Sequence, residues 1–358
     1  MAQHFGGTLL RPYIIAEIGM NYEGSMARAK AMIEAAARGG AQAAKFQSYQ
    51  ADTLASRTSS PAYWDLDAEP TESQHQLFSK YDAFGPDEYA ELAAHCRKVG
   101  IDFMSTPFDL AAVDYLEPLV PMFKIASADI TNVPLIRKVA RTGKPVVVSV
   151  GAASDEEIHT AVELLEAAGA QQIALLHCVL NYPTLPANAN VAGIRRLTDD
   201  FHGRAVVGYS DHVAPDADGR MPAVELAAAF GAVIVEKHFT DDRNAAGNDH
   251  YHAMDEDGLR HLVERLQAMA ELAGTGVPDL EVQRSAISNA RRRIFTARPV
   301  AAGAVIAEDD LIALRADTGV AVAAWDTVVG ARLTSAKEVG EPLTESDLET
   351  NAAASGSL

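Results

Sequence analysis

The feature that most constrains the fold is an eightfold repetition of a short apolar segment followed by an amphipathic run. The apolar segments cover residues 13–19, 43–47, 102–108, 122–127, 146–151, 173–179, 206–212 and 233–239. Short β-branched runs are typical of buried parallel strands, and several runs between them end in Gly, as helices do. The repetition predicts an α/β fold, a (β/α)8 TIM barrel. The alternative is a doubly wound open sheet, but no G-x-G-x-x-G turn follows the first strand.

Charge and composition restrict the partners of the chain. The formal net charge of −19 argues against nucleic acid or a membrane surface, although a local cluster of Lys and Arg could still bind an anionic substrate. We see no signal peptide and no apolar run of membrane-spanning length. Two cysteines, Cys96 and Cys178, do not make a disulfide framework. We therefore expect a soluble, cytoplasmic protein.

Two segments depart from the repeat. Residues 48–85 form a long polar connection with an aromatic pair, Tyr63 and Trp64, which predicts a lid over the catalytic face; a tolerated surface insertion is the alternative. The barrel pattern then gives way to short β-like pieces and Gly turns. We assign the barrel to residues 1–275, a linker to 276–290, a small mostly-β domain to 291–350 and a disordered tail to 351–358.

Polar side chains stand at the ends of the predicted strands, which is where barrel enzymes carry their chemistry. These and the residues just beyond them include Glu17, Lys45, Thr106, Lys124, Ser127, Ser149, Tyr182, Ser210, His212, Glu236 and His238. Taken singly, such a Ser is most often a helix cap and such a Lys reaches solvent. Their convergence predicts one polar pocket, and two lysines among hydroxyls suit a phosphate and a carboxylate.

A divalent metal is the second expectation. His212 and His238 end neighbouring strands, the seventh and the eighth, where two imidazoles could share one ion. Carboxylates that could join them, or bind substrate hydroxyls, are Glu17, Glu236 and Asp249. We treat His250 and His252 as loop residues. By strand alternation Lys237 points away from the pocket, and it is left out of the site.

Several stretches of the chain resemble the sialic acid synthase family. They are IAEIGMNYEGS, AAKFQ, MSTPFD, FKIASADITNVPLI, LHCVLNYPT, VGYSDH, VIVEKHFT and GND, in order within residues 10–350. The resemblance implies a TIM barrel followed by a SAF (antifreeze-like) domain, in a domain-swapped homodimer. It also implies a transferase that condenses phosphoenolpyruvate with an aldose, typically an N-acylated amino sugar, to a nonulosonic acid.

The resemblance also assigns roles to residues. His212 and His238 match metal ligands, usually of Mn²⁺, with Mg²⁺ or Co²⁺ as alternatives. The positions that match the phosphoenolpyruvate site are Lys45, Thr106, Lys124, Ser127, Ser149 and Ser210. The positions that match contacts to the sugar or assistance to the chemistry are Glu17, Tyr182, Glu236 and Asp249. Arg315 matches an arginine that reaches the sugar N-acyl group across the dimer.

The departures from the family pattern cluster where the sugar should bind. Leu180 replaces a usual Asn or Ser, and Ala253 replaces a frequent Ser. The hypothesis is that the acceptor is not N-acetylmannosamine. Two rival functions stay open: a Schiff-base pyruvate aldolase that uses Lys45 or Lys124, and a non-catalytic sugar-binding barrel.

Overall fold

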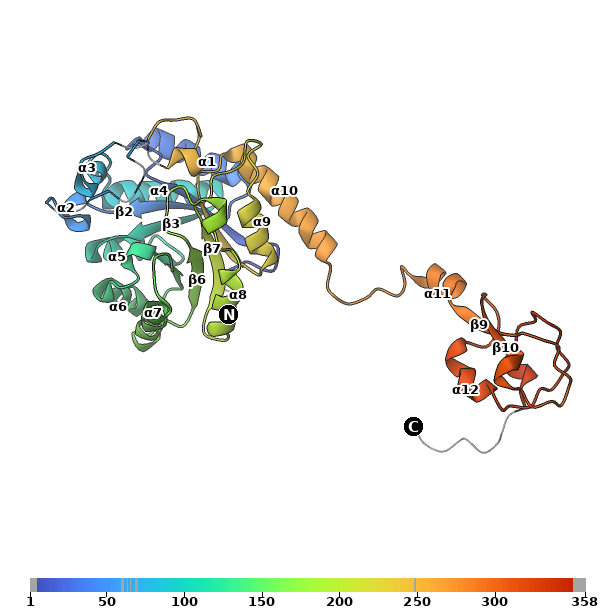
Figure 1. Ribbon diagram of the computed structural model, residues 1–358. Coiled ribbons are helices and arrows are strands. Elements are labelled where there is room, and N and C mark those ends of the chain that lie inside the picture. Colours follow the sequence, from blue (N-terminus) through green and yellow to red (C-terminus); the bar gives the residue numbers. More distant parts are fainter. Residues whose placement is uncertain are drawn as a thin grey trace. The chain divides into compact units, whose positions relative to one another are not determined.

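The computed structural model describes residues 5–58, 61–62, 64, 66–67, 70–247 and 249–349. The chain forms two compact units, Met1–Gly274 and Thr275–Leu358, and each is described by itself (Figure 1). Tyr63 of the predicted lid and the predicted tail, residues 351–358, lie outside the described residues.

The first unit is built on eight parallel strands. They are β1 (Tyr13–Gly19), β2 (Ala43–Ser48), β3 (Asp102–Pro107), β4 (Phe123–Ile125), β5 (Val146–Ser149), β6 (Ile173–Cys178), β7 (Val206–Asp211) and β8 (Ile234–His238). The strand order is β3-β2-β1-β8-β7-β6-β5-β4, so β1 pairs with β8, as it would not in an open doubly wound sheet. The predicted TIM barrel is confirmed, nearly closed, with its one break in hydrogen bonding among the described strands between β3 and β4.

Helices lie between the strands, and the longer ones cover the outside of the barrel (Figure 1). They are α1 (Met26–Gly39), α2 (Ala51–Leu54), α3 (Gln74–Phe78), α4 (Pro86–Val99), α5 (Leu110–Leu116), α6 (Val133–Arg141), α7 (Asp155–Ala167), α8 (Gly193–Asp200), α9 (Pro222–Ala229) and α10 (Glu256–Ala273). Short 3-10 turns are η2 (Ser127–Asp129), η3 (Pro186–Asn188) and η4 (His250–His252). The sequence sets these boundaries locally. Ser154 and Glu157 form a capping box at the start of α7, and Gly40 ends α1 with a φ of 100°.

Strand alternation separates two apolar layers and one polar layer. Along each strand, every second side chain points into the barrel. In the lower part of the barrel these inward residues are apolar: Tyr13, Ile15, Ala43, Met104, Met122, Val147, Ala174, Leu176 and Ile234. The outward residues pack against the helices in the main core. Two positions further along the same inward face, Ile15 is followed by Glu17, Ala43 by Lys45 and Val147 by Ser149. The polar pocket is therefore the top layer of the barrel interior.

The second unit has its own small core. Its elements are α11 (Arg284–Ala290), β9 (Arg292–Thr296), η5 (Glu308–Asp310), β10 (Leu311–Arg315), η6 (Val322–Ala324), α12 (Trp325–Val328) and η7 (Glu345–Asp347). Strands β9 and β10 are antiparallel, with Arg315 opposite Arg292. The buried core residues are Ile294, Val300, Ile306, Leu311, Val328, Leu333 and Leu343. Helix α11 falls within the stretch that was predicted as a linker. Across both units, the described helices include none that combines the length and the apolar character needed to cross a membrane.

Candidate functional site

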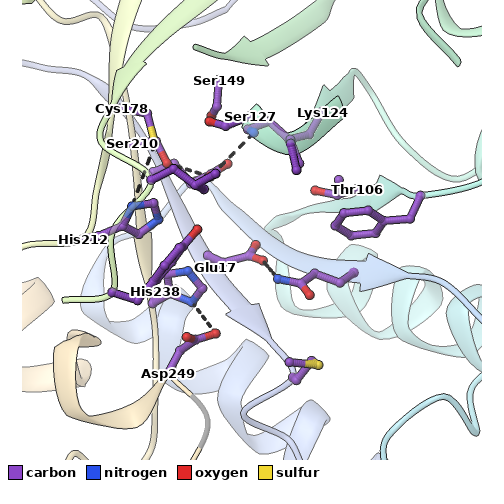
Figure 2. Close-up of a pocket in the computed structure, with 18 of the residues that line it drawn as sticks. Glu17, Thr106, Lys124, Ser127, Ser149, Cys178, Ser210, His212, His238 and Asp249 are labelled. Atoms are coloured by element: carbon purple, nitrogen blue, oxygen red, sulfur yellow. Dashed lines mark hydrogen bonds and ion pairs between the residues drawn. The ribbon is translucent and has the colours of Figure 1, made fainter. Parts of the chain in front are cut away.

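A cavity of about 300 Å³ lies at the carboxyl ends of the barrel strands (Figure 2). The sequence-predicted residues that line it are Glu17, Lys45, Thr106, Lys124, Ser127, Ser149, Tyr182, Ser210, His212, Glu236, His238 and Asp249. The structure thus brings together every predicted site residue of the barrel unit. Arg315 ends β10 in the second unit, where its side chain is exposed.

The floor of the cavity holds two carboxylates and two lysines. Lys45 Nζ lies 2.5 Å from a Glu17 oxygen and 3.6 Å from a Glu236 oxygen. Lys124 Nζ lies 3.8 Å from Glu236 and donates a hydrogen bond to the Ile125 carbonyl. All four charged side chains are buried, so their charges interact in a medium that screens them weakly.

The two carboxyl groups respond in opposite directions to this environment. Burial raises the pKa of Glu17 to about 7; Lys45 opposes the shift and Glu236 adds to it. Burial also acts to raise the pKa of Glu236, but Lys124 and Lys45 together hold it below its ordinary value. A pair of carboxyl groups whose environments push their pKa values apart is suited to separate acid–base and charge-balancing roles.

The pKa values of the two lysines are also shifted in opposite directions. Burial acts to lower the pKa of Lys45, but the facing carboxylates of Glu17 and Glu236 raise it overall. Burial lowers the pKa of Lys124, and the Lys45 charge adds to that, against the attraction of Glu236. An additional anion beside Lys124 would therefore stabilise its charged form.

Hydroxyl groups line the side of the cavity next to the lysines. Lys45 donates a hydrogen bond of 3.0 Å to Thr106, and Ser210 donates one of 3.0 Å to Glu236. The Gly151 amide donates one of 2.9 Å to Ser127. The buried Ser149 hydroxyl has no hydrogen-bond partner among the described residues. Buried hydroxyls are nearly always hydrogen bonded, so the Ser149 hydroxyl is available to bind a ligand atom in the cavity.

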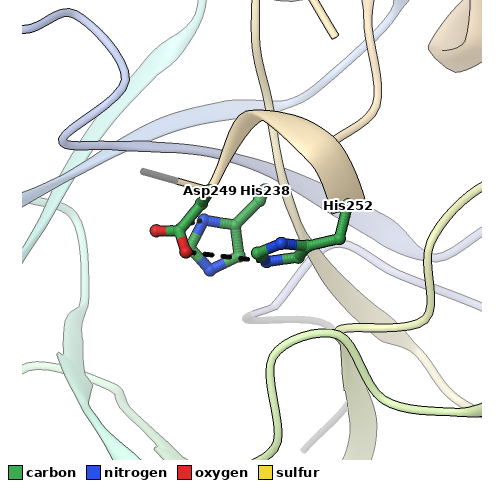
Figure 3. Close-up of side chains that lie close together, drawn as sticks. All are labelled: His238, Asp249 and His252. Carbon is green, nitrogen blue, oxygen red and sulfur yellow. Dashed lines mark ion pairs between the residues drawn. The ribbon is translucent and has the colours of Figure 1, made fainter. Parts of the chain in front are cut away.

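Three imidazoles and one carboxylate form a second group, which we call the histidine cluster: His212, His238, His252 and Asp249. In its core, His238, Asp249 and His252 each place a ligand atom within 4.8 Å of the others (Figure 3). His238 Nδ1 lies 3.4 Å from Asp249, and His252 Nε2 lies 3.8 Å from it. The His212 ring centre lies 5.5 Å from that of His238 and 6.0 Å from that of His252.

The donor set of the histidine cluster fits a divalent metal. Burial lowers the pKa of both His238 and His252, with added repulsion from neighbouring histidines, which keeps the imidazoles in the neutral form that binds metal. His212 Nδ1 lies 3.0 Å from the Val179 carbonyl, and donation from Nδ1 would leave Nε2 as the ligand atom. The sequence predicted His212 and His238 as the metal-binding pair. His238 belongs to the group with Asp249 and His252, and His212 lies beside this group.

Sequence reasoning missed two residues of the site. His252 was treated as a loop residue, although it follows Asp249 at a spacing of three, which brings both onto one turn of η4. Cys178 was considered only for disulfides, yet its Sγ lies 3.8 Å from His212 Nδ1 and lines the cavity. A cysteine at the end of the sixth strand carries the same positional signal as the polar residues that were selected.

The outer wall of the cavity is largely apolar. Five of its residues come from the 48–85 connection that was predicted as a lid: the apolar Leu54, Trp64, Leu77 and Phe78, and the polar Gln74. Phe78 packs edge-on against Tyr49, with ring centres 5.4 Å apart. Leu180, the departure noted in the sequence, also lines the cavity, as does Tyr251. The connection therefore forms part of the pocket wall.

Comparison with known proteins gives a consistent result. A NeuB family model matches residues 32–278, and a SAF domain model matches residues 291–349. The N,N'-diacetyllegionaminic acid synthase of Legionella pneumophila is 34% identical over 94% of each chain. The N-acetylneuraminate-9-phosphate synthase of Drosophila melanogaster is 32% identical over 75% of this chain and 71% of that protein.

A crystal structure of the N-acetylneuraminic acid synthetase of Leptospira borgpetersenii, in complex with citrate, has a similar fold. Its TM-score to this chain is 0.65, with 32% identity, and the match covers 77% of this chain and 90% of the other. The match in sequence and in fold thus extends to proteins of one enzyme family. The chain belongs to the NeuB family and carries a C-terminal SAF domain.

Proposed function

We propose that this NeuB-family nonulosonic acid synthase condenses phosphoenolpyruvate with an N-acylated amino sugar in a metal-dependent reaction that releases phosphate. The observation that carries the proposal is the convergence of two lysines, two carboxyl groups and four hydroxyls in one cavity beside the histidine cluster. The lysines and hydroxyls can bind an anionic donor. The neighbouring histidine cluster can hold a metal ion that would polarise an aldehyde.

The donor is assigned to the lysine side of the cavity. Phosphoenolpyruvate carries a phosphate and a carboxylate, and Lys45 and Lys124 supply compact positive charges for them. The hydroxyl groups of Ser127, Ser149 and Ser210 supply hydrogen bonds, and Ser149 has none to give up among the described residues. An anion beside a buried lysine stabilises its charged form. Binding of the donor would therefore raise the lowered pKa of Lys124.

The reaction forms one carbon–carbon bond and breaks one carbon–oxygen bond. Carbon 3 of phosphoenolpyruvate attacks the aldehyde carbon, and the aldehyde oxygen takes up a proton to become a hydroxyl. Water adds at carbon 2, and the C–O bond to phosphate then breaks, which leaves a 2-keto acid and inorganic phosphate. A divalent ion, when bound by the histidine cluster, would supply Lewis-acid polarisation of the aldehyde.

Glu17 is the residue best suited to accept a proton from the attacking water. Its carboxyl is buried, lies 2.5 Å from Lys45, and has a pKa near 7, so it exchanges a proton easily at neutral pH. Glu236 stays ionised between the two lysines and balances their charge. Tyr182 packs on the His212 ring with centres 4.2 Å apart, where it can position the sugar.

For the acceptor, we propose an N-acylated amino sugar other than N-acetylmannosamine. The relative from Legionella pneumophila is an N,N'-diacetyllegionaminic acid synthase, which supports a di-N-acylated 6-deoxyhexose. The apolar wall formed by Leu180, Trp64 and Phe78 suits methyl and acyl groups better than free hydroxyls. We further propose that the enzyme works as a domain-swapped homodimer in which Arg315 contacts the sugar N-acyl group.

The test measures phosphate release from phosphoenolpyruvate by chelator-stripped protein, with and without added Mn²⁺, over a panel of aldoses. The panel includes N-acetylmannosamine and di-N-acylated 6-deoxyhexoses. We expect release that depends on both the metal and one aldose. Equal turnover of N-acetylmannosamine and the best other aldose would refute the acceptor hypothesis. Failure to bind phosphoenolpyruvate at all would refute the synthase function and favour the non-catalytic barrel.

One observation favours the second candidate, a Schiff-base aldolase. The lowered pKa of Lys124 is the property that a nucleophilic lysine needs. Borohydride reduction in the presence of pyruvate would trap an adduct on Lys124 if this function were correct, and chelators would not affect turnover. The synthase proposal expects no adduct and a loss of activity on chelation.

A further inference from the structure

His252 is the last residue of the short 3-10 turn η4. Its side chain is completely buried, and neither ring nitrogen has a hydrogen-bond partner among the described residues. Buried polar groups are nearly always hydrogen bonded or bound to a metal. A buried imidazole with neither nitrogen hydrogen bonded is thus arranged for coordination rather than for holding the loop.

The surroundings of His252 provide the other ligands. Its ring centre lies 4.9 Å from that of His238 and 6.0 Å from that of His212, and Asp249 lies 3.8 Å from its Nε2 (Figure 3). Imidazoles that bind one ion at about 2.1 Å hold their ring centres on the order of 5 Å apart. The arrangement therefore needs only small side-chain movements to close around an ion.

His250, on the same turn, serves as the internal comparison. Its Nδ1 is hydrogen bonded to the Thr240 hydroxyl at 2.7 Å, and its Nε2 faces Glu23 at 3.6 Å. It is as fully buried as His252, and neither ring lines the cavity, but only His252 belongs to the group with His238 and Asp249. The two histidines of this turn therefore differ: His250 is held by one hydrogen bond to the fold through Nδ1, whereas neither nitrogen of His252 is hydrogen bonded and its ring lies beside His238 and Asp249.

We propose that His252 is a ligand of the divalent ion, so that the site holds three imidazoles, from His212, His238 and His252, next to the Asp249 carboxylate. This rests on the metal dependence in the proposed function. The consequence is a change of metal preference. Imidazole ligands favour Fe²⁺, Co²⁺ and Zn²⁺, whereas Mn²⁺ and Mg²⁺ prefer sites rich in oxygen. The enzyme should bind Co²⁺ much more tightly than Mn²⁺, and His252 should account for much of the difference.

The experiment measures metal affinity directly, without turnover. Chelator-stripped wild-type protein, His252→Gln and His252→Leu are titrated with Co²⁺ and with Mn²⁺ in competition with a fluorescent chelator, and the visible spectrum of bound Co²⁺ is recorded. Loss of a metal-site residue costs at least about 10–100-fold in affinity. We expect that loss for Co²⁺, a smaller one for Mn²⁺, and a changed Co²⁺ spectrum. The matched control, His250→Gln, should bind both ions as the wild type does.

If His252 had a purely structural role, its variants would change the Tm rather than the metal affinity. In the metal-free protein, His252→Leu removes two unpaired buried nitrogens, so its Tm should equal or exceed that of the wild type. A lower metal-free Tm with unchanged Co²⁺ affinity would overturn the proposal while leaving the metal-dependent synthase intact. Failure of the wild type to bind either ion would overturn both. Phosphoenolpyruvate binding, measured on the same samples, checks that each variant is folded.

Discussion

At the scale of single residues, the most informative pair is Glu17 and Glu236. Both are buried in one cavity and both face Lys45, yet only Glu236 also has Lys124 within 3.8 Å. Lys124, with Lys45 and the Ser210 hydrogen bond, holds the pKa of Glu236 below its ordinary value, whereas burial dominates at Glu17 and raises its pKa to about 7. Two chemically similar side chains thus acquire pKa shifts of opposite direction from their different neighbours.

The first prediction concerns Glu17→Gln and the stability of metal-stripped protein. The pKa of Glu17 rises from 4.5 to about 7 on folding, so the folded state holds a proton that the unfolded state releases. This contribution is complete below pH 4.5 and is lost as pH rises through 7. Wild type should lose up to about 3 kcal/mol of unfolding free energy between pH 5 and 8 relative to Glu17→Gln.

Urea denaturation at a series of pH values measures this difference. The groups that face Glu17 are Lys45, Glu236 and Gln47, and all three are retained in the variant. Glu91→Gln, which alters a half-exposed surface carboxyl, should follow the wild-type profile. Parallel profiles for wild type and Glu17→Gln would mean that Glu17 is ionised throughout this range.

At the scale of elements, strands β7 and β8 are joined on their outer face by a buried ion pair. Asp211 lies opposite Lys237 in the register, and Lys237 Nζ donates to Asp211 and to the Val213 carbonyl, both at 2.7 Å. The other Asp211 oxygen accepts from the Tyr209 hydroxyl and the Val213 amide. Lys237 therefore faces away from the cavity, as strand alternation predicted, and stabilises the strands that present His212 and His238.

The second prediction is that Lys237→Met destabilises the barrel by about 3–5 kcal/mol, because it leaves a buried carboxylate without its counter-charge. Asp211→Asn in the same chain should restore part of the loss, since the amide oxygen can still accept from Tyr209. The surface pair Lys138 and Asp114 provides the control, and Lys138→Met should change stability by less than about 1 kcal/mol. A cost below 1 kcal/mol for Lys237→Met would disprove the structural role.

At the scale of the whole molecule, the chain consists of two units with separate cores. The residues that line the cavity all belong to the barrel unit, whereas Arg315 belongs to the second unit. If the proposed swap occurs, each active site takes its barrel from one chain and its Arg315 from the other. The arrangement would make acceptor binding, but not donor binding, depend on the dimer.

The third prediction tests the swap by mixing two defective variants. Arg315→Ala should raise the KM for the sugar and leave phosphoenolpyruvate affinity unchanged, and Glu17→Gln should be inactive. In randomly mixed twofold dimers about a quarter of the sites would combine an intact Glu17 with an intact Arg315. Phosphate release by co-refolded mixtures should rise to that level. Activity no greater than that of Arg315→Ala alone would mean that both residues act within one chain, or that Arg315 does not act.

The sequence by itself determined the fold class and most of the charged and hydroxyl-bearing residues of the cavity. The reason is periodicity: eight strand–helix repeats define a barrel, and alternation within each strand decides which side chain faces inward. Glu17, Lys45 and Ser149 could be selected because each sits two positions beyond an inward apolar residue at a strand end. That rule is local, so it needs no knowledge of distant contacts.

Only the tertiary structure decided the pKa shifts of those residues and which of them lie together. The pKa separation of Glu17 and Glu236 depends on distances to Lys45 and Lys124, which come from two other strands. His252 lies in a turn after β8, outside the strand pattern, so no periodicity indicates where its ring points. Its place beside His238 follows from how that turn packs over the barrel, and electrostatic and coordination chemistry depend on such separations rather than on order along the chain.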